Sequence, residues 1–364
     1  MKILHITTNF YPTIGGIETF VYEVSRKMVE KGHKVYVVTS DKGPSGNEIS
    51  PKKSNIDDIN VKRFPFHSFL RYTRSIKALK FIRSKEWDVI HIHNIGFFTD
   101  FIPLFKSKAK KIFLHTHGGI FHTKKLSLFK YIYWNTYKIR PISVDKIIAH
   151  SDHDFKLFSE IFDKKKIELI NYGIDWEKLS KIKNNSNNKT IVYIGRLSSN
   201  KRLERIIKIL PFIKKEIPDI KLMLIGSDWG EKNKLIKLAK KLDVVNNINF
   251  IGSIPHKKVY DYFSKADVFM LSSDYEGFGI SVIEAMAAGL VVIVNDIPTM
   301  REEIIKDKKD GFIKDFDDYK GVAELTLKVL RDKNLRRTVS SNAKMATKKY
   351  RWEKILLKLN ELYK

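Results

Sequence analysis

Short apolar segments alternate with longer amphipathic ones along most of the chain. In the first half, the apolar runs are rich in β-branched residues and are bounded by turn or charged residues, as buried strands are. Apolar residues at helical spacing lie between them, for example at 17–31 and 152–162. This alternation predicts a doubly wound parallel sheet. The apolar runs are residues 2–8, 33–40, 88–93, 111–117, 145–151 and 167–173.

The same alternation starts again after a polar, Asn-rich stretch at residues 181–190, which we interpret as a linker. We therefore predict two Rossmann-like α/β domains, residues 1–180 and 181–348, that face a cleft. Ligands of such sheets bind outside the carboxyl ends of the strands. The later apolar runs are residues 190–197, 220–227, 247–254, 266–273 and 290–297.

Composition agrees with a packed protein of this size. Of the 364 residues, 43% are hydrophobic and 30% are charged, which is enough apolar surface for two cores. Because the chain has no cysteine, it has no disulfide, thiolate metal site or cysteine nucleophile. The opening residues predict a strand rather than a signal peptide, and no apolar run has the roughly 18 residues of a spanning helix. We expect a cytoplasmic protein, soluble or bound to the inner membrane face.

The formal net charge of +27 favours polyanionic partners, although a generally Lys-rich composition would also produce it. Residues 61–140 hold 17 Lys and Arg against 3 acids, a net of 17 − 3 = +14. Cations alternate there with aromatic and aliphatic residues, a pattern that suits an anionic membrane surface as well as ordinary basic helices. No nucleic-acid recognition motif is present and the cations occur in both halves, so we expect no nucleic-acid partner.

The stretch SSDYEGFGISVIEAMAAG, residues 272–289, contains two glutamates eight positions apart. We predict that Glu276, Gly277, Phe278 and Gly279 form a turn after a strand, followed by a helix up to a C-terminal cap at Gly289. Glycines at a helix start let a ligand approach backbone N–H groups at the positive end of the helix dipole. The other glutamate, Glu284, lies in an almost wholly apolar helix and needs a polar partner, such as a ligand hydroxyl.

Two cations follow the first strand of the second half. Arg196 comes directly after that strand, and Lys201 opens the next helix. Cations in these positions converge on one anion and can hold a diphosphate without a metal. The alternative is two ordinary surface cations in a basic chain.

Two further patterns lie in the first half. Gly15 and Gly16 lead into a helix after the first strand, as a phosphate-facing loop or a simple tight turn would. Two His-x-His pairs, His91/His93 and His115/His117, end strands, so each pair shares a face of the sheet. No carboxylate accompanies them at a metal-site spacing, so we expect no metal. His117 precedes two glycines, which favours a polar contact to substrate.

Taken together, these motifs resemble the retaining glycosyltransferases of family 4, which have the two-domain GT-B fold. The resemblance extends from FYPTIGGIETFV through HTHGG, NYGID and GRLSSNKRLERII to SSDYEGFGISVIEAMAAG. The tail YRWEKILLKLNELYK is similar to the final helix of that family, which implies that about 349–364 packs back on the first domain. The Glu-x7-Glu element with an upstream Arg-x4-Lys is highly specific in combination.

The resemblance implies a role for each motif. Glu284 would bind the ribose hydroxyls, and Glu276 with its loop would meet the donor sugar. Arg196 and Lys201 would hold the diphosphate and stabilise the departing nucleotide.

It also implies that Gly15 and Gly16 lie near the phosphates and that His117 contacts the transferred sugar. The base would lie near Gly252 to Pro255. The implied donor is a UDP- or GDP-sugar of a hexose or N-acetylhexosamine, used without a metal. The implied acceptor is a lipid-linked or cell-envelope glycan.

The sequence departs from the family pattern at two places, after the last strand and directly before it. NDIPTMREEI stands where many members have a Gly-Gly turn, and Leu290 stands where a proline is usual. The first departure leaves the sugar contacts of that loop, and with them the identity of the donor sugar, open, and neither departure affects the core motifs. A sugar-nucleotide epimerase or a phosphorylase on the same fold is an alternative function, and a nucleic-acid-binding protein is a less favoured one.

Overall fold

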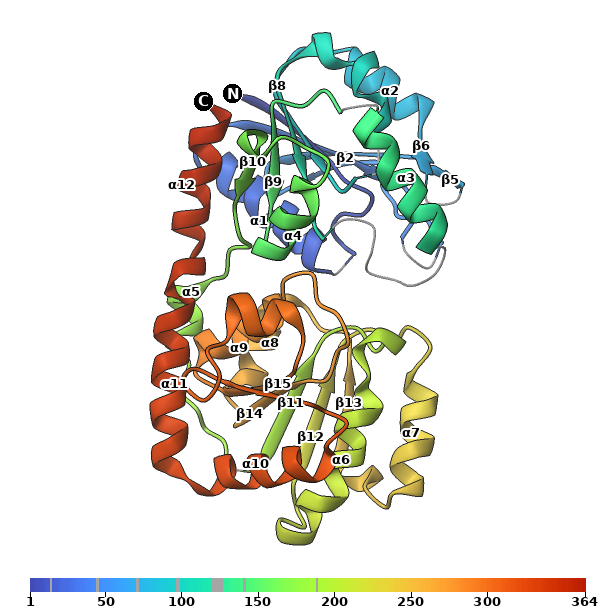
Figure 1. Ribbon diagram of the computed structural model, residues 1–364. Coiled ribbons are helices and arrows are strands. Elements are labelled where there is room, and N and C mark those ends of the chain that lie inside the picture. The colour runs from blue at the N-terminus through green and yellow to red at the C-terminus, as the bar shows by residue number, and fades with distance from the viewer. Residues whose placement is uncertain are drawn as a thin grey trace. The chain divides into compact units, whose positions relative to one another are not determined.

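The computed structural model describes residues 1–13, 15–43, 46–69, 72–95, 99–118, 127–139, 142–187 and 189–364. The chain forms two compact units (Figure 1). The first comprises Met1–Tyr172 together with Glu353–Lys364, and the second comprises Gly173–Trp352. The Asn-rich stretch that we interpreted as a linker, residues 181–190, therefore lies within the second unit.

An eight-stranded sheet forms the centre of the first unit, in the order β10-β9-β8-β7-β1-β2-β4-β3. Its pairs are parallel except β3 with β4, which is antiparallel. Strands β5 and β6 form a separate antiparallel pair, and they lie between β4 and β7 in the sequence. The strands are β1 (Lys2–Ile6), β2 (Lys34–Ser40), β3 (Lys53–Ile56), β4 (Ile59–Phe64), β5 (His67–Phe69), β6 (Tyr72–Arg74), β7 (Trp87–His93), β8 (Ala109–His115), β9 (Lys146–Ala149) and β10 (Ile167–Leu169).

Helices flank this sheet (Figure 1). In α1 the buried residues Phe20, Val21, Val24 and Met28 recur at helical spacing and form one apolar face. Trp87, at the start of β7, is 2% exposed and donates its indole N–H to the carbonyl of Ile82 at 2.9 Å. The helices are α1 (Gly16–Glu30), α2 (Ile76–Arg83), α3 (Ser127–Ile139), α4 (Asp152–Ser159) and α12 (Trp352–Tyr363).

The last helix, α12, contacts the sheet of the first unit. The buried Tyr363 hydroxyl lies 2.5 Å from Nδ1 of His91, and its ring lies 5.5 Å from the Phe113 ring. The Lys111 ammonium also reaches the carbonyl of Leu362 at 3.3 Å. Chain segments that are 272 residues apart thus share one core.

A six-stranded parallel sheet forms the centre of the second unit, in the order β13-β12-β11-β14-β15-β16. The order reverses direction at β11 and β14, which are adjacent in the sheet but distant in sequence. This is the topological switch point at which open α/β sheets bind ligands. The strands are β11 (Thr190–Ile194), β12 (Lys221–Ile225), β13 (Ile248–Gly252), β14 (Val268–Leu271), β15 (Val291–Asn295) and β16 (Phe312–Lys314).

Helices of the second unit cover both faces of its sheet (Figure 1). Helix α9 is buried along its length from Val282 to Ala288, which explains why its sequence is apolar on all sides. The helices are α5 (Trp176–Leu179), α6 (Leu203–Glu216), α7 (Lys232–Lys241), α8 (His256–Phe263), α9 (Ile280–Ala288), α10 (Tyr319–Arg331) and α11 (Lys333–Thr347).

Two parallel-sheet α/β domains are thus confirmed, with one addition. We predicted a purely parallel first sheet, whereas β3 pairs antiparallel at its edge. The segment forms a hairpin because Asp57 and Asp58, both with positive φ, make a tight turn between β3 and β4. Among the described residues, no helix is long and apolar enough to cross a membrane.

Candidate active site

Two loops meet at the switch point of the second sheet. The loop after β11 carries Arg196 and Lys201, and the loop after β14 carries Glu276. The hydroxyl of Ser272 lies 2.9 Å from the carbonyl oxygens of both Lys201 and Arg202, which fastens one loop to the other. The fold therefore brings together residues that are 75 positions apart in the sequence.

A buried ion pair joins these loops. The Lys201 ammonium lies 2.6 and 2.8 Å from the two carboxylate oxygens of Glu276, and the two side chains are only 13% and 11% exposed. Thr299 donates its hydroxyl hydrogen to the backbone carbonyl of Glu276 at 2.8 Å, so this residue is held by its side chain and by its main chain. A ligand at this site would therefore meet the Lys201 ammonium and the Glu276 carboxylate as one ion pair.

The glycines around Phe278 have different environments. A methyl group at Gly277 would meet no atom within 4 Å, so the backbone there is open to approach. Gly279 has φ +83° and is the N-terminal cap of α9. Phe278 itself is 4% exposed and packs edge-on against Tyr350 at 5.6 Å. Gly277 thus suits a ligand-facing turn, whereas Gly279 is needed for its positive φ and its close approach to Met300, and Phe278 is a core residue.

The second glutamate of the motif has a side-chain partner. Glu284 is 5% exposed, and its carboxylate lies 2.8 Å from Nε2 of His256, the first residue of α8. Gly252 ends β13 with φ +82°, and Pro255 is the N-terminal cap of α8. The predicted base-binding segment therefore leads directly to the histidine that contacts Glu284.

Arg196 differs from the other cations of this region. Its residue is exposed, and it forms no ion pair among the described residues. Its guanidinium carbon lies 4.7 Å from the centre of the Trp229 ring. An unpaired arginine beside the switch point is available to an anionic ligand.

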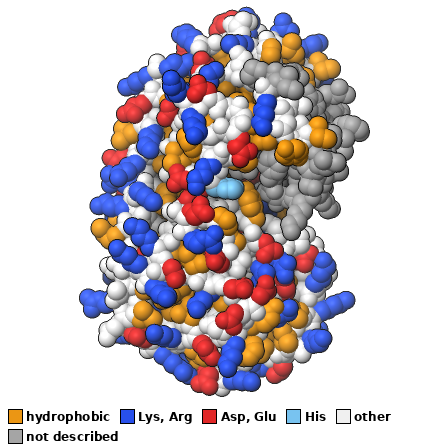
Figure 2. All heavy atoms as spheres, in the orientation of Figure 1, with side chains coloured by type: hydrophobic (Ala, Val, Ile, Leu, Met, Phe, Trp, Pro, Cys, Tyr) orange, Lys and Arg blue, Asp and Glu red, His pale blue; other side chains and the backbone are white. Residues whose placement is uncertain are grey.

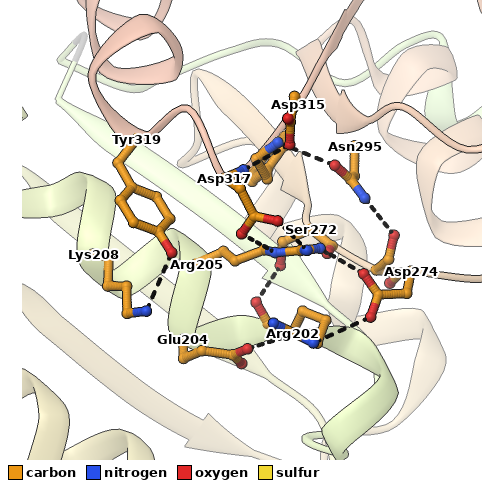
Figure 3. Close-up of polar contacts among 12 residues, drawn as sticks. Arg202, Glu204, Arg205, Lys208, Ser272, Asp274, Asn295, Asp315, Asp317 and Tyr319 are labelled. Carbon is orange, nitrogen blue, oxygen red and sulfur yellow. Dashed lines mark hydrogen bonds and ion pairs between the residues drawn. The ribbon is translucent and has the colours of Figure 1, made fainter.

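A third cation, Arg205 on α6, serves to fix the loop after β14 (Figure 3). Its guanidinium donates to Asp274 at 2.6 Å and to both oxygens of Asp317, at 2.9 and 2.6 Å. It also reaches the carbonyl of Ser272 at 3.2 Å. Asn295 donates to the carbonyl of Ser273 at 3.1 Å. This network holds the segment that precedes Glu276.

In the first unit, Gly15 is the N-terminal cap of α1 and Gly16 is its first residue. A methyl group at Gly15 would lie 2.3 Å from a carboxylate oxygen of Glu18. The pair therefore forms the tight helix entry that we predicted after β1. Its contact with phosphate remains a prediction.

His93, His115 and His117 belong, together with His5 and His150, to one continuous row of linked rings, and His91 stacks beside it with its ring centre 4.4 Å from that of His93. At each junction Nδ1 of one ring faces Nε2 of the next: His5 to His93 at 3.0 Å, His93 to His117 at 2.9 Å, His117 to His150 at 2.7 Å and His150 to His115 at 3.2 Å. A neutral imidazole has one donor and one acceptor nitrogen. If every ring carries its hydrogen on the same nitrogen, all four contacts are therefore satisfied as hydrogen bonds.

Burial keeps this row uncharged. Desolvation lowers the pKa of His5 and of His150 to about 3. It also lowers the pKa values of His91, His93, His115 and His117 well below 6.5, and their mutual repulsion as cations adds to this. The triads His5/His91/His93 and His93/His115/His117 bring their ring nitrogens within 4.8 Å, but most of these nitrogens are hydrogen-bonded to one another or to tyrosines.

His117 has both ring nitrogens engaged inside the first unit. Nε2 faces His93 at 2.9 Å, and Nδ1 faces the Tyr172 hydroxyl at 2.5 Å as well as His150. Its φ of +48° places it in the left-handed region, where the chain turns at the end of β8. A ring contact to the transferred sugar would have to share one of these hydrogen bonds.

Several of these residues were not identified from sequence. His256 and Trp229 carry no motif of their own, and only the folding of α8 and of the loop after β12 brings them to Glu284 and Arg196. His5 and His150 stand alone in sequence, but they end up beside the His-x-His pairs because β1, β8 and β9 bring them there. The row of histidines could have been suspected from the sequence, because several of the predicted buried strands each contain or end at a histidine.

Comparison with known proteins identifies the family. The model for Glycosyl transferases group 1 matches residues 175–346, and the model for Glycosyltransferase Family 4 matches residues 14–178. A GDP-mannose:cellobiosyl-diphosphopolyprenol alpha-mannosyltransferase of Xanthomonas oryzae pv. oryzae is 30% identical over 351 residues, which cover 93% of this chain and 91% of that protein.

Solved structures agree on the fold. Sucrose-phosphate synthase from Thermosynechococcus elongatus has a TM-score of 0.79 at 20% identity, covering 100% of this chain and 98% of that one. Anabaena HepE in complex with UDP and glucose has a TM-score of 0.77 at 18% identity, covering 100% and 99%. The epimerase and phosphorylase alternatives are not favoured by these matches. The chain therefore belongs to the family 4, group 1 glycosyltransferases and is an enzyme that moves a sugar from a nucleotide-sugar donor.

Proposed function

We propose that the enzyme transfers a hexose or N-acetylhexosamine from a GDP- or UDP-sugar, with retention and without a metal ion, to a lipid-linked or envelope glycan. The observation that carries this proposal is the group at the switch point, where Arg196, the Lys201–Glu276 pair and the start of α9 lie after β11 and β14. The relative from Xanthomonas oryzae, whose name includes GDP-mannose and a diphosphopolyprenol, supports the donor and acceptor classes.

In the proposed reaction, the bond between the anomeric carbon and the diphosphate oxygen breaks, and the nucleoside diphosphate leaves with the electron pair. The acceptor oxygen bonds to the anomeric carbon, and its proton passes to the departing phosphate. Negative charge grows on the diphosphate, so fixed cations stabilise the transition state more than the ground state. Arg196, Lys201 and the amino end of α9 supply this charge, which removes the need for a metal.

We assign Glu276 a binding role rather than a nucleophilic one. Both of its carboxylate oxygens already face Lys201 at 2.6 and 2.8 Å, so the pair is suited to hydrogen-bond sugar hydroxyls while remaining charge-balanced. This assignment agrees with transfer on one face of the sugar, without a covalent glycosyl-enzyme. His117 and Gly15–Gly16 remain the proposed contacts from the first unit.

Glu284 is proposed to bind the ribose hydroxyls, with His256 as the partner that orients its carboxylate. Glu284→Gln is expected to weaken binding of the cognate nucleoside diphosphate by about 10- to 100-fold, because a charged hydrogen bond contributes about 1.5–3 kcal/mol. Calorimetry with UDP, GDP and ADP, together with their sugars, measures this loss and names the donor class.

The matched control is Glu324→Gln, which removes a carboxylate from an exposed pair with Lys320 in the same unit. This variant should bind nucleotide like the wild type. Equal affinity of Glu284→Gln and wild type would exclude the ribose role. Failure of the wild type to bind any of the nucleotides would exclude the proposed donor classes.

A basic surface of the first unit is proposed to contact the inner face of the membrane. Residues 61–140 carry the net charge of +14 derived above. Among the described residues of this range, the exposed large apolar side chains are Ile76 on α2, Leu104, and Tyr131 with Ile132 on α3, which are 50–71% exposed. On the face drawn in Figure 2, Lys and Arg are scattered among acidic and apolar side chains.

Sedimentation with vesicles tests this surface. We expect binding to vesicles containing anionic lipid, weakening as salt is added, and reduced several-fold in the double variant Lys77→Glu/Lys80→Glu on α2. The control Lys237→Glu/Lys241→Glu makes the same charge change on α7 of the second unit. Equal binding to neutral and anionic vesicles would exclude the membrane proposal.

A further inference from the structure

Trp229 lies in the loop after β12 and supports the unpaired cation of the donor site. Its side chain is 49% exposed, and the guanidinium carbon of Arg196 lies 4.7 Å from the ring centre. Arginine over the face of a tryptophan is attracted by the negative charge of the ring face. Trp229 belongs to no motif found in the sequence, whereas Arg196 belongs to the motif that we propose binds the donor.

The loop of Trp229 is tied to the loop of Arg196 by main-chain contacts. The Trp229 N–H donates to the carbonyl of Leu197 at 2.9 Å, and the Leu197 N–H donates to the carbonyl of Ser227 at 2.8 Å. The indole N–H donates to the Ser227 hydroxyl at 3.1 Å. The tryptophan is therefore fixed at its backbone and at its ring.

Two glycines allow these loops to approach so closely. Gly226, with φ +148°, is placed so that a methyl group on it would lie 1.8 Å from the carbonyl oxygen of Gly195. Asp228 then accepts from the N–H groups of residues 230, 231 and 232 at 2.9–3.1 Å, which fixes the turn into α7. The ring is thus presented by a rigid turn rather than by a loose loop.

Unlike an ion pair, the aromatic contact leaves the N–H groups of the arginine free of a carboxylate. Lys201 and Arg205 direct their N–H groups to carboxylates. The ring face of Trp229 instead attracts the guanidinium through its π-electrons, so this contact does not engage the N–H groups of Arg196 with a carboxylate. Arg196 therefore keeps its planar fork available for two phosphate oxygens, since no carboxylate in the described part of the chain pairs with it.

We propose that Trp229 is a positioning residue that holds Arg196 for the donor diphosphate. This inference rests on the proposed function, because it assumes that Arg196 binds that diphosphate. Arg196 supplies the charge. Trp229 restricts the side chain of Arg196 to fewer conformations before the donor binds, so less conformational entropy is lost on binding.

Calorimetry and steady-state kinetics on single and double variants test the inference. Trp229→Ala is expected to weaken binding of the cognate nucleoside diphosphate by about 5- to 30-fold and to lower kcat/KM for the donor similarly. Trp229→Phe should recover most of the loss, because it keeps an aromatic face. In an Arg196→Ala background, Trp229→Ala should have no further effect.

Phe212→Ala is the matched control, since Phe212 is another partly exposed aromatic residue, on α6 of the same unit. It should bind nucleotide like the wild type. Unchanged affinity of Trp229→Ala, or additive losses in the double variant, would overturn the positioning role while leaving the proposed function intact. If the wild type binds no nucleoside diphosphate, the proposed function fails and the inference fails with it.

Discussion

Replacing Lys201 with alanine is expected to lower kcat by about 10²- to 10³-fold, as removal of a fixed donor to a developing anion does in other enzymes. Lys201 lies at the switch point and is only 13% exposed, so water cannot fully replace its charge. Its ammonium also sets the position of Glu276, at 2.6 and 2.8 Å. One substitution therefore affects both the diphosphate and the sugar contacts that we propose.

The same substitution is expected to destabilise the second unit. Removal of one partner leaves the Glu276 carboxylate, 11% exposed, without its cation, and breaking a buried pair typically costs about 3–5 kcal/mol. Loss of activity alone would therefore not separate catalysis from folding. The free energy of unfolding must be measured beside the rate.

A double variant makes this separation. Lys201→Met/Glu276→Gln removes both charges and should recover much of the stability, while transfer remains low because the cation is missing. Lys214→Ala breaks an exposed pair with Asp243 and should leave the rate unchanged. A well-folded Lys201→Ala enzyme with a rate near that of the wild type would show that this lysine does not stabilise the leaving group.

Mild acid is expected to unfold the first unit well before the second. The row of histidines and the adjacent His91 together include five fully buried rings, none more than 1% exposed: His5, His91, His93, His115 and His150. We expect the first unit to lose up to about 7 kcal/mol of stability between pH 7.5 and pH 5.5. Such a loss is comparable with the whole stability of an ordinary domain.

The sign follows from the direction of the shifts. Burial lowers the pKa of each ring from 6.5, to about 3 for His5 and His150, so the folded unit stays unprotonated as pH falls. The unfolded chain binds protons below pH 6.5, and each ring then favours unfolding by about 1.4 kcal/mol at pH 5.5. Burial raises the pKa of Asp154, so the folded unit can take up one proton there as pH falls. This opposes the loss of stability caused by the histidines, but it involves a single proton.

Urea unfolding at pH 7.5, 6.5 and 5.5, combined with hydrogen exchange of β7 and β8, measures this dependence in the first unit. His91→Gln should reduce the slope of stability against pH by about one proton, while His153→Gln, at an exposed position, should not. A stability that is flat between pH 7.5 and 5.5 would mean that the folded row accepts protons, contrary to its burial.

The switch-point site was predicted in part from the sequence. The strands and helices around Glu276 followed from apolar periodicity, and α9 runs from Ile280 to Ala288 with Gly289 as its cap, as we predicted. Glycines, charges and caps act over a few residues, so a sequence displays them directly. The need of Glu284 for a polar partner was also visible, because a carboxylate in an apolar helix cannot be left alone.

The identity of partners required the fold. His256 approaches Glu284 from another helix, and Trp229 approaches Arg196 from another strand end. The antiparallel β3 was missed because the alternation of a half-exposed edge strand is weaker than that of a buried run. The five linked histidine rings come from four separate strand ends, and no local pattern specifies such an assembly.

By itself, the sequence determined the alternating α/β elements, the two-domain architecture and the motifs of a nucleotide-sugar transferase, since these depend on local periodicity and on residue types at short spacing. Tertiary structure alone decided which side chain each cation of the site contacts. Among the described residues, Lys201 is engaged by Glu276, Arg205 by Asp274 and Asp317, and Arg196 by the ring of Trp229. That difference arises from contacts between distant segments, whose geometry is set by the order of strands in the sheet.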